Sequence, residues 1–193
     1  MQGRLFLISS SSGAGKTSLA KSLVQKIGAK CNIERVVTYT TRPQGKSEVH
    51  GKDYHFLSDA QFEKGEQDGL FLEWSTSYEH VYASPASILE GLKQGKSYLL
   101  VMDHDGVANV SLMIPDAVTI WILVEDVQEI KRRLEGRGRD TAEQIALRVG
   151  LVQKENEMAR SSAVYQYEVV NQNFGKACNE LVDIVKNSIG CCT

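Results

Sequence analysis

A Ser/Gly-rich loop between an apolar run and an amphipathic segment constrains this chain more than any other feature. The apolar run at residues 5–8 leads into Ser10-Ser11-Ser12-Gly13-Ala14-Gly15-Lys16-Thr17, and apolar residues with helical spacing follow at 19–27. A strand, a glycine-rich loop and a helix in this order let backbone N–H groups and the positive end of the helix dipole converge on phosphate oxygens. The sequence therefore predicts a phosphate-binding loop after the first strand.

The loop also indicates which residues would contact a bound nucleoside triphosphate. We expect contacts from Ser11, Ser12, Gly13, Ala14, Gly15, Lys16, Thr17 and Ser18. Lys16 would neutralise charge on the β- and γ-phosphates, and the Thr17 hydroxyl would ligate Mg²⁺. The loop departs from G-x-x-x-x-G-K-[ST] at its first position, where Ser10 replaces glycine. A Ser/Gly-rich turn before a helix would explain any one of these features, but not their combination.

Further apolar runs alternate with helical patterns along the chain. The runs cover residues 98–102, 118–124 and 167–170, and a second amphipathic stripe covers 174–189. Cys178 lies on that stripe, which predicts a small core residue rather than a reactive thiol. The alternation is typical of a parallel sheet covered by helices, so we expect a three-layer α/β/α fold.

Composition and charge exclude several classes of protein. The chain has 193 residues, of which 42% are hydrophobic and 24% charged, as in globular rather than disordered proteins. A formal net charge of -2 gives no overall positive field for a nucleic acid backbone. No apolar stretch approaches the ~20 residues of a membrane span. We therefore expect a cytoplasmic protein with no nucleic acid partner and no membrane attachment.

The cysteines show no pattern of a functional site. Cys31, Cys178, Cys191 and Cys192 form no C-x-x-C pair and no zinc-type spacing with histidine, so we expect reduced thiols. A prenylation box needs cysteine at the fourth position from the end, where this sequence has Gly190. The terminal cysteines therefore predict no lipid anchor.

Two polar stretches interrupt the alternation of strands and helices. Residues 35–96 are rich in Gly, His, Tyr and charge, and a Gly/Arg-rich segment at 135–140 separates two helical patterns. We expect one domain with a core at 1–34, 97–134 and 150–193, a mixed α+β acceptor-binding subdomain at 35–96 and a helical lid at 135–149. A lid that closes over two substrates favours a small kinase over a GTPase switch or an ATPase motor.

Motifs downstream of the loop resemble those of one enzyme family. They are Thr38-Tyr39-Thr40-Thr41-Arg42, residues 48–56, Phe71-Leu72-Glu73-Trp74, Val81-Tyr82-Ala83-Ser84, and residues 102–107 and 133–138. Their order and spacing resemble guanylate kinase from about residue 3 to residue 188. The resemblance implies ATP-dependent phosphorylation of GMP, and of dGMP, by direct in-line transfer with Mg²⁺ bound to ATP. It also implies that ATP and GMP are the partners, and that the protein is a monomer or a homodimer.

The resemblance assigns recognition of the guanine base to two acids and two hydroxyls. Glu73 and Asp103 match the acids that read the base, and Thr38 and Ser84 match the hydroxyls near guanine O6. Guanine presents the N1–H and N2 amino donors to a carboxylate, whereas adenine has an acceptor at N1. Such pairing discriminates by roughly 10⁴–10⁵. We therefore expect a strong preference for GMP over AMP.

The resemblance assigns three further residues to the phosphate of GMP. Arg42, Tyr54 and Tyr82 match its donors, which would make charge-assisted and neutral hydrogen bonds to one dianion. Without the resemblance, half-buried packing in a small sheet would explain the two tyrosines as well.

Arginines of the lid match residues that face the triphosphate. These are Arg133, Arg137 and Arg148, and together with Lys16 and Arg42 they are the predicted catalytic residues. Their expected role is to neutralise charge on the transferring phosphoryl group. Arg132 and Arg139 instead fit a solvated helix face with ion pairs at i, i+4 spacing.

No general base is expected, because a phosphate monoester has its second pKa near ~6 and attacks as the dianion. Asp103, His104 and Asp105 are consecutive in the chain, so we expect no metal cluster there.

Two positions depart from the family pattern. Gly45 stands where the family usually has a second arginine, and the adjacent Lys46 is the expected substitute, as a point charge without a bidentate fork. Val101 stands where the family usually has an aspartate near the waters of Mg²⁺.

Two other functions fit parts of the pattern. A ribose 1,5-bisphosphate-type kinase shares the core and lid but lacks the guanine-reading set, which is present here. A non-catalytic guanylate-kinase-like interaction module typically has a degraded phosphate loop, whereas Gly13, Gly15, Lys16 and Thr17 are retained. Mg·ATP binding would separate an enzyme from such a module.

Overall fold

A five-stranded parallel sheet forms the centre of the structure, a computed structural model that describes residues 2–77, 79–138 and 140–191. The strand order is β2-β7-β1-β8-β9, and every pair of neighbours is parallel. The strands are β1 (Leu5–Ser10), β2 (Ile33–Arg35), β7 (Ser97–Val101), β8 (Val118–Leu123) and β9 (Tyr167–Val170). The runs expected to be strands are confirmed.

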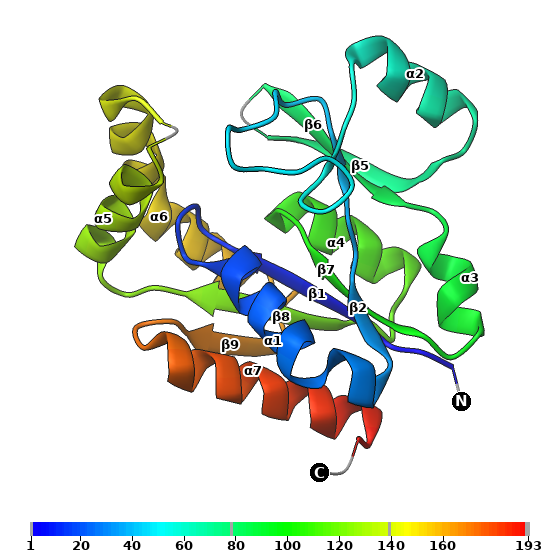
Figure 1. Cartoon of the computed structure of the whole chain (residues 1–193). Helices are drawn as coiled ribbons and strands as arrows, with labels where there is room; N and C mark the ends of the chain where they lie inside the picture. The colour runs from blue at the N-terminus through cyan, green and yellow to red at the C-terminus, as the bar shows by residue number, and fades with distance from the viewer. Residues whose placement is uncertain (1, 78, 139, 192–193) are drawn as a thin grey trace.

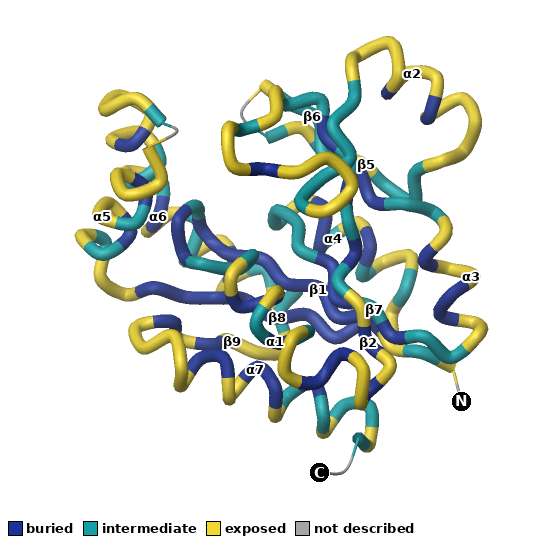
Figure 2. The backbone as a smooth tube through the Cα atoms, in the orientation of Figure 1, coloured by how far each residue is buried: buried dark blue, intermediate teal, exposed yellow. Residues whose placement is uncertain are grey.

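Helices cover both faces of this sheet. Adjacent residues of a strand point to opposite faces, and every residue of the first strand is buried, so both faces must be covered. The covering helices are α1 (Lys16–Cys31), α3 (Ile88–Lys93), α4 (His104–Met113), α5 (Val127–Arg137), α6 (Ala142–Ser161) and α7 (Phe174–Ile189), while α2 (Asp59–Gln67) packs elsewhere. Phe6 and Ile8 of β1 pack with α1 and α7, whereas Leu5 and Leu7 pack with α3 and α4. Figure 1 shows α1 and α7 side by side on one face, and Figure 2 shows the buried strands beneath them. The expected three-layer α/β fold is therefore confirmed.

A smaller four-stranded sheet has the order β4-β3-β6-β5. Its strands are β3 (Tyr39–Thr40), β4 (His55–Phe56), β5 (Phe71–Ser77) and β6 (His80–Pro85). Helix α2 packs against it through Phe62, whose ring stacks on Phe71 at 5.1 Å between centroids. Figure 1 shows this sheet and the α5–α6 pair on the same side of the large sheet, with the loop between β1 and α1 lying between them.

The Gly/Arg-rich segment begins within α5, which ends at Arg137. Gly138 caps α5 in the left-handed region at φ 62°, and Thr141 begins α6 with a reciprocal capping box to Gln144. Arg132 is exposed, which confirms its expected place on a solvated helix face, but it pairs with Glu129 at 2.9 Å and with Asp126 at 3.4 Å rather than at i, i+4 spacing. Arg139 lies outside the described residues. Among the described residues, no helix has the length and apolar character needed to cross a bilayer.

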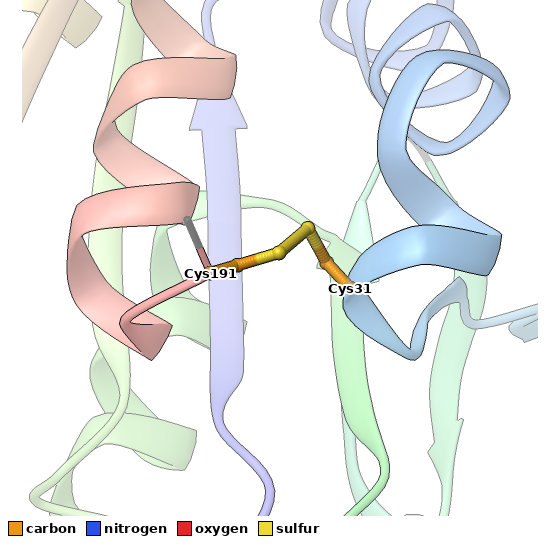
Figure 3. The surroundings of a disulfide bond; sticks show 2 residues. All are labelled: Cys31 and Cys191. Carbon is orange, nitrogen blue, oxygen red and sulfur yellow. A yellow bond between two sulfur atoms is a disulfide. The ribbon is translucent and has the colours of Figure 1, made fainter. Parts of the chain in front are cut away.

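Cys31 and Cys191 form a disulfide (Figure 3), so the expectation of reduced thiols is wrong for this pair. Cys31 ends α1, Cys191 follows α7, and the packing of these helices brings the two Cα atoms to 5.9 Å. The cysteines are 160 positions apart, so only the fold shows that they meet. Cys178 is buried and forms no disulfide, and its Sγ donates to Ser22 Oγ at 3.2 Å, which fits the small core residue that the helical stripe predicts. Cys192 lies outside the described residues.

Candidate active site

The loop between β1 and α1 has a backbone that favours glycine at two positions. Gly13 and Gly15 have φ angles of 83° and 92°, in the left-handed region. A Cβ on Gly15 would come 2.7 Å from the amide nitrogen of Asn171, and one on Gly13 would come 3.0 Å from the Ile130 side chain. The loop therefore turns tightly in front of the α1 N-terminus, which is the geometry that phosphate binding needs.

Two side chains from other elements hold the loop at the carbonyl of Ala14. Asn171, after β9, donates to this oxygen from Nδ2 at 2.7 Å, and Arg133 on α5 donates from Nη1 at 3.3 Å. Arg133 also donates to the Asn171 carbonyl at 3.1 Å and pairs with Glu129 at 2.9 Å. The predicted lid arginine Arg133 thus braces the loop through contacts within the protein.

Helix α6 contacts the loop at Ser12 through two residues of opposite charge. Arg148 donates from Nη1 to Ser12 Oγ at 3.2 Å and lies 3.4 Å from Asp140 Oδ1. The Glu155 carboxylate accepts the backbone N–H of Ser12, and its Oε2 is buried without a hydrogen bond among the described residues. Burial raises the pKa of Glu155, against the opposing effect of nearby Lys16. Glu155 could not be predicted from the sequence, because one glutamate in a polar helix carries no distinguishing signal.

Charged groups from several elements converge on Lys16, the first residue of α1. Its Nζ donates at 3.3 Å to the hydroxyl of Ser10, the residue that replaces glycine in the loop pattern. Burial, followed by the nearby Arg137 guanidinium, lowers the pKa of Lys16 to about 8, against the opposing carboxylates of Glu155 and Asp103. Arg137 therefore lies near enough for its charge to act on Lys16, and two cations near the loop are suited to neutralising a polyphosphate.

The small sheet presents the residues predicted to read guanine. In the antiparallel β5–β6 pair, Glu73 lies opposite Ser84, and opposite residues share one face. Ser84 Oγ donates to Glu73 Oε1 at 2.7 Å, whereas Glu73 Oε2 is buried and has no hydrogen bond among the described residues. Thr38, just before β3, is also buried. This face thus holds a carboxylate oxygen that is ready to accept a donor.

Asp103 reaches this face from the large sheet. It precedes α4 and caps it, because Oδ1 accepts the backbone N–H of Gly106 at 2.8 Å, and Oδ2 accepts from Ser75 Oγ at 2.8 Å. A Cβ on Gly106 would lie 3.1 Å from Asp103 Oδ1 and 3.4 Å from Glu73 Oε2, so both carboxylates lie over the first turn of α4. Burial, and to a smaller extent the charge of Asp103, raises the pKa of Glu73 against the opposing Ser84 bond. The two predicted acids therefore lie together.

Arg42, Tyr54 and Tyr82 form a neighbouring cluster. The guanidinium of Arg42 lies 5.5 Å from the centre of the Tyr54 ring, and the rings of Tyr54 and Tyr82 are 6.0 Å apart. Glu48 pairs with Arg42 at 3.0 Å. Burial lowers the pKa of Arg42, but Tyr82 and Glu48 outweigh it and raise the pKa overall. Burial, followed by Tyr82, raises the pKa of Tyr54. The cluster can offer one guanidinium and two phenols to an anion.

The match to known proteins covers almost the whole chain, because the guanylate kinase family model matches residues 2–188. The chain belongs to the guanylate kinase family. Guanylate kinase from Chromobacterium violaceum is 37% identical over 185 residues, which cover 95% of this chain and 85% of that protein. Guanylate kinase from Rubrobacter xylanophilus is 33% identical over 189 residues, which cover 97% and 96%. This relationship makes the chain a nucleotide-binding phosphotransferase.

The fold matches the family as well. The crystal structure of guanylate kinase from Anaplasma phagocytophilum aligns with a TM-score of 0.78 at 24% identity and covers 96% of this chain and 86% of that one. At this identity the likeness concerns the fold alone.

The two departures from the guanylate kinase pattern have contacts of their own. The Gly45 N–H donates to Glu48 Oε2 at 2.8 Å, so the backbone of this position is tied to the partner of Arg42. Lys46 is exposed. Val101, at the end of β7, packs against the main hydrophobic core. An aspartate at position 101 would disturb apolar packing here, so the valine fits its surroundings.

Proposed function

We propose that this guanylate kinase family member transfers the γ-phosphoryl group of ATP to the phosphate of GMP, giving ADP and GDP. The observation that carries the proposal is the buried Glu73 Oε2, which lies beside Asp103 and has no hydrogen bond among the described residues. A buried acceptor without a partner costs about 1–3 kcal/mol, which a donor from the substrate recovers. Guanine supplies such donors at N1 and N2, whereas adenine has an acceptor at N1.

The hydroxyls near the acids complete the proposed base site. Ser84 lies at the proposed base site and donates its single proton to Glu73 Oε1, so the hydroxyl of Thr38 is the proposed donor to guanine O6. Since dGMP carries the same base and phosphate as GMP, we propose it as a second acceptor.

Arg42, Tyr54 and Tyr82 are the proposed ligands of the GMP phosphate. Their cluster adjoins the base site because Tyr82 and Ser84 alternate on one strand and share a face. The acceptor phosphate is mostly a dianion at neutral pH, with its second pKa near ~6, so it can attack without a general base. The reaction then depends on positioning and on charge stabilisation.

The loop residues 11–18 are the proposed ATP ligands, with Lys16, Arg137 and Arg148 facing the charge that develops during transfer. We assign Arg133 a supporting part in this set, since it braces the loop at Ala14. Thr17, in the first turn of α1, offers the oxygen ligand type that Mg²⁺ prefers, beside the loop. Bound Mg²⁺ would neutralise phosphate charge.

We further propose that residues 35–96 and 135–149 act as an acceptor-binding subdomain and a lid around the core. Arg137 ends α5 and α6 begins at Ala142, within the residues assigned to the lid, which supports the assignment. Small-molecule substrates, a cytoplasmic location and a monomer or homodimer complete the proposal.

Phosphate transfer from Mg·ATP to a panel of acceptors tests the function. The panel contains GMP, dGMP, AMP, UMP, CMP and ribose 1,5-bisphosphate, with Lys16→Ala as the control. We expect turnover of GMP to exceed that of AMP by at least about a thousandfold and to be lost in the control. Turnover of the sugar bisphosphate alone, or no Mg·ATP binding at all, would overturn the proposal in favour of the other kinase or the interaction module.

A further inference from the structure

Asp103 is held by donors from two different elements. Its Oδ1 accepts the backbone N–H of Gly106 in α4 at 2.8 Å, and its Oδ2 accepts the hydroxyl of Ser75 in β5 at 2.8 Å. The bond to Ser75 links the small sheet to the loop that follows β7 of the large sheet. Asp103 therefore takes its orientation from both parts of the site.

Ser75 lies on the same face of β5 as Glu73. Glu73, Ser75 and Ser77 are partly buried, whereas Trp74 and Thr76 between them are exposed, as expected for alternating strand residues. Opposite this row on β6 lie Ser84 and Tyr82, which pair with Glu73 and Ser75 respectively. Ser75 thus lies opposite Tyr82, a proposed phosphate contact, and next to Glu73 on the same face of β5.

The two acids of the site are oriented in the same way. Ser84 donates to Glu73 at 2.7 Å, and Ser75 donates to Asp103 at 2.8 Å. Each of the two carboxylates is therefore held by its own serine from the β5–β6 pair. A serine hydroxyl has a single proton to donate, and a carboxylate oxygen that accepts it keeps a second lone pair. Each acid can therefore be fixed by its serine and still accept from a bound base.

We propose that Ser75 is a positioning residue for guanine recognition, because its hydroxyl holds Asp103 in the orientation in which Asp103 and Glu73 accept from the base together. This inference rests on the proposed phosphorylation of GMP and adds to it a residue outside the motifs that predict it. Ser75 acts through Asp103, so its effect concerns the binding of guanine rather than the transfer step.

The expected loss of GMP affinity in Ser75→Ala corresponds to one hydrogen bond to a charged group. Without Ser75, the Asp103 side chain must be ordered when the base binds, and the lost bond and ordering together correspond to roughly a 5–10-fold loss of GMP affinity. Ser75→Ala should therefore raise KM for GMP and Kd for GMP by this factor. It should leave kcat at saturating GMP and KM for ATP within about twofold, because neither depends on how Asp103 is held before binding.

Two further variants make the test specific. Ser75→Thr keeps the hydroxyl on a strand residue and should restore KM for GMP to within about twofold of wild type. Ser77→Ala removes the same side chain two positions further along the same face and should leave every constant unchanged. A rise in KM for GMP in Ser77→Ala as large as in Ser75→Ala would overturn the inference.

A double-mutant cycle shows whether Ser75 acts through Asp103. In an Asp103→Ala background, Ser75→Ala should cause no further loss of GMP affinity, because the group that it orients is gone. A full second loss in that background would overturn the inference. So would an unchanged KM for GMP in Ser75→Ala, or a parallel change in KM for ATP, which would indicate a general structural effect.

The same measurements separate this inference from the function on which it rests. Wild-type protein that neither binds nor phosphorylates GMP would overturn the proposed function and the role of Ser75 with it. Wild-type protein that phosphorylates GMP, while Ser75→Ala does so with the same KM, would overturn the role of Ser75 alone.

Discussion

The loop side and the base-reading side of the site are built in opposite ways. On the loop side, cations surround a continuous stretch of chain whose backbone is braced at Ala14 by Asn171 and Arg133. On the base-reading side, two acids arrive from different sheets, and Glu73 Oε2 lies buried without a hydrogen bond among the described residues. A braced cationic loop can hold phosphate attached to any base, whereas a buried acceptor selects its ligand by the donor it carries. Binding of the triphosphate and choice of the acceptor base therefore reside in separate parts of the molecule.

The largest effect should come from the loop side. Lys16→Ala removes the ammonium on which the surrounding charges converge. Turnover should fall by roughly 10³-fold or more, as expected for a cation that stabilises phosphoryl transfer. The Kd for GMP, measured by calorimetry without ATP, should change by less than about threefold. Equal losses of ATP and GMP binding would contradict the separation of the two sides.

A substitution on the base-reading side should cause a smaller loss of activity, and one that concerns GMP rather than ATP. Glu73→Gln places an amide among groups that must accept from guanine, so kcat/KM for GMP should fall by roughly 10²-fold or more. Steady-state kinetics measure this change, and the Kd for Mg·ATP should stay constant. Glu63→Gln, at an exposed position on α2, is the matched control and should behave as wild type. A loss of Mg·ATP affinity in Glu73→Gln would show that the two sides are not independent.

The pH dependence of nucleotide affinity should also differ between the two sides. Because the pKa of Lys16 is lowered to about 8, the free protein loses this charge above pH 8, and Mg·ATP affinity should fall there by up to about tenfold per unit. Because the pKa of Glu73 is raised, its carboxylate is protonated at higher pH than an ordinary glutamate, so GMP affinity should fall on the acid side. Separate titrations with each nucleotide from pH 4.5 to pH 9.5 measure the fall in Mg·ATP affinity at high pH and the fall in GMP affinity at low pH. Parallel pH profiles for the two nucleotides would be inconsistent with this assignment.

The same lysine should influence stability. Between its folded pKa of about 8 and the ordinary value of 10.5, the unfolded chain holds more protons at this position than the folded one. The Lys16 contribution to the free energy of unfolding therefore increases as pH rises through this window. Urea unfolding of wild type and Lys16→Met, compared at pH 7.5 and pH 9.5, isolates the Lys16 contribution. An identical pH dependence of the free energy of unfolding in both proteins would refute this contribution.

The smallest effect on activity is expected from the disulfide, which lies away from both sides. Cys31→Ser opens a link across 160 positions, and such links contribute about 2–4 kcal/mol. The Tm should fall by roughly 5 °C or more, while kcat and both KM values stay within about twofold. Calorimetry with and without reductant measures the same difference in wild type. An unchanged Tm on reduction would contradict a stabilising role.

Local order along the chain explains what could be predicted from the sequence. The loop and the strands follow from contiguous patterns, and motifs pointed to Glu73, Asp103 and Arg42 before their contacts were known. The features that could not be predicted from the sequence depend on segments that only folding brings together. Ser75 meets Asp103 across 28 positions, and Cys31 meets Cys191 across 160. The bonds of Arg133 to Ala14 and Asn171 likewise depend on the end of β9 lying beside α5.

Selection of guanine by Glu73 and Asp103 is tested most directly by equilibrium titration of the wild-type protein with GMP and with AMP, without ATP, at neutral pH. Both nucleotides carry the same phosphate, so the difference reports the base alone. We predict that GMP binds at least about a hundredfold more tightly than AMP. Equal affinities would contradict the assignment of the two acids as the base-reading residues.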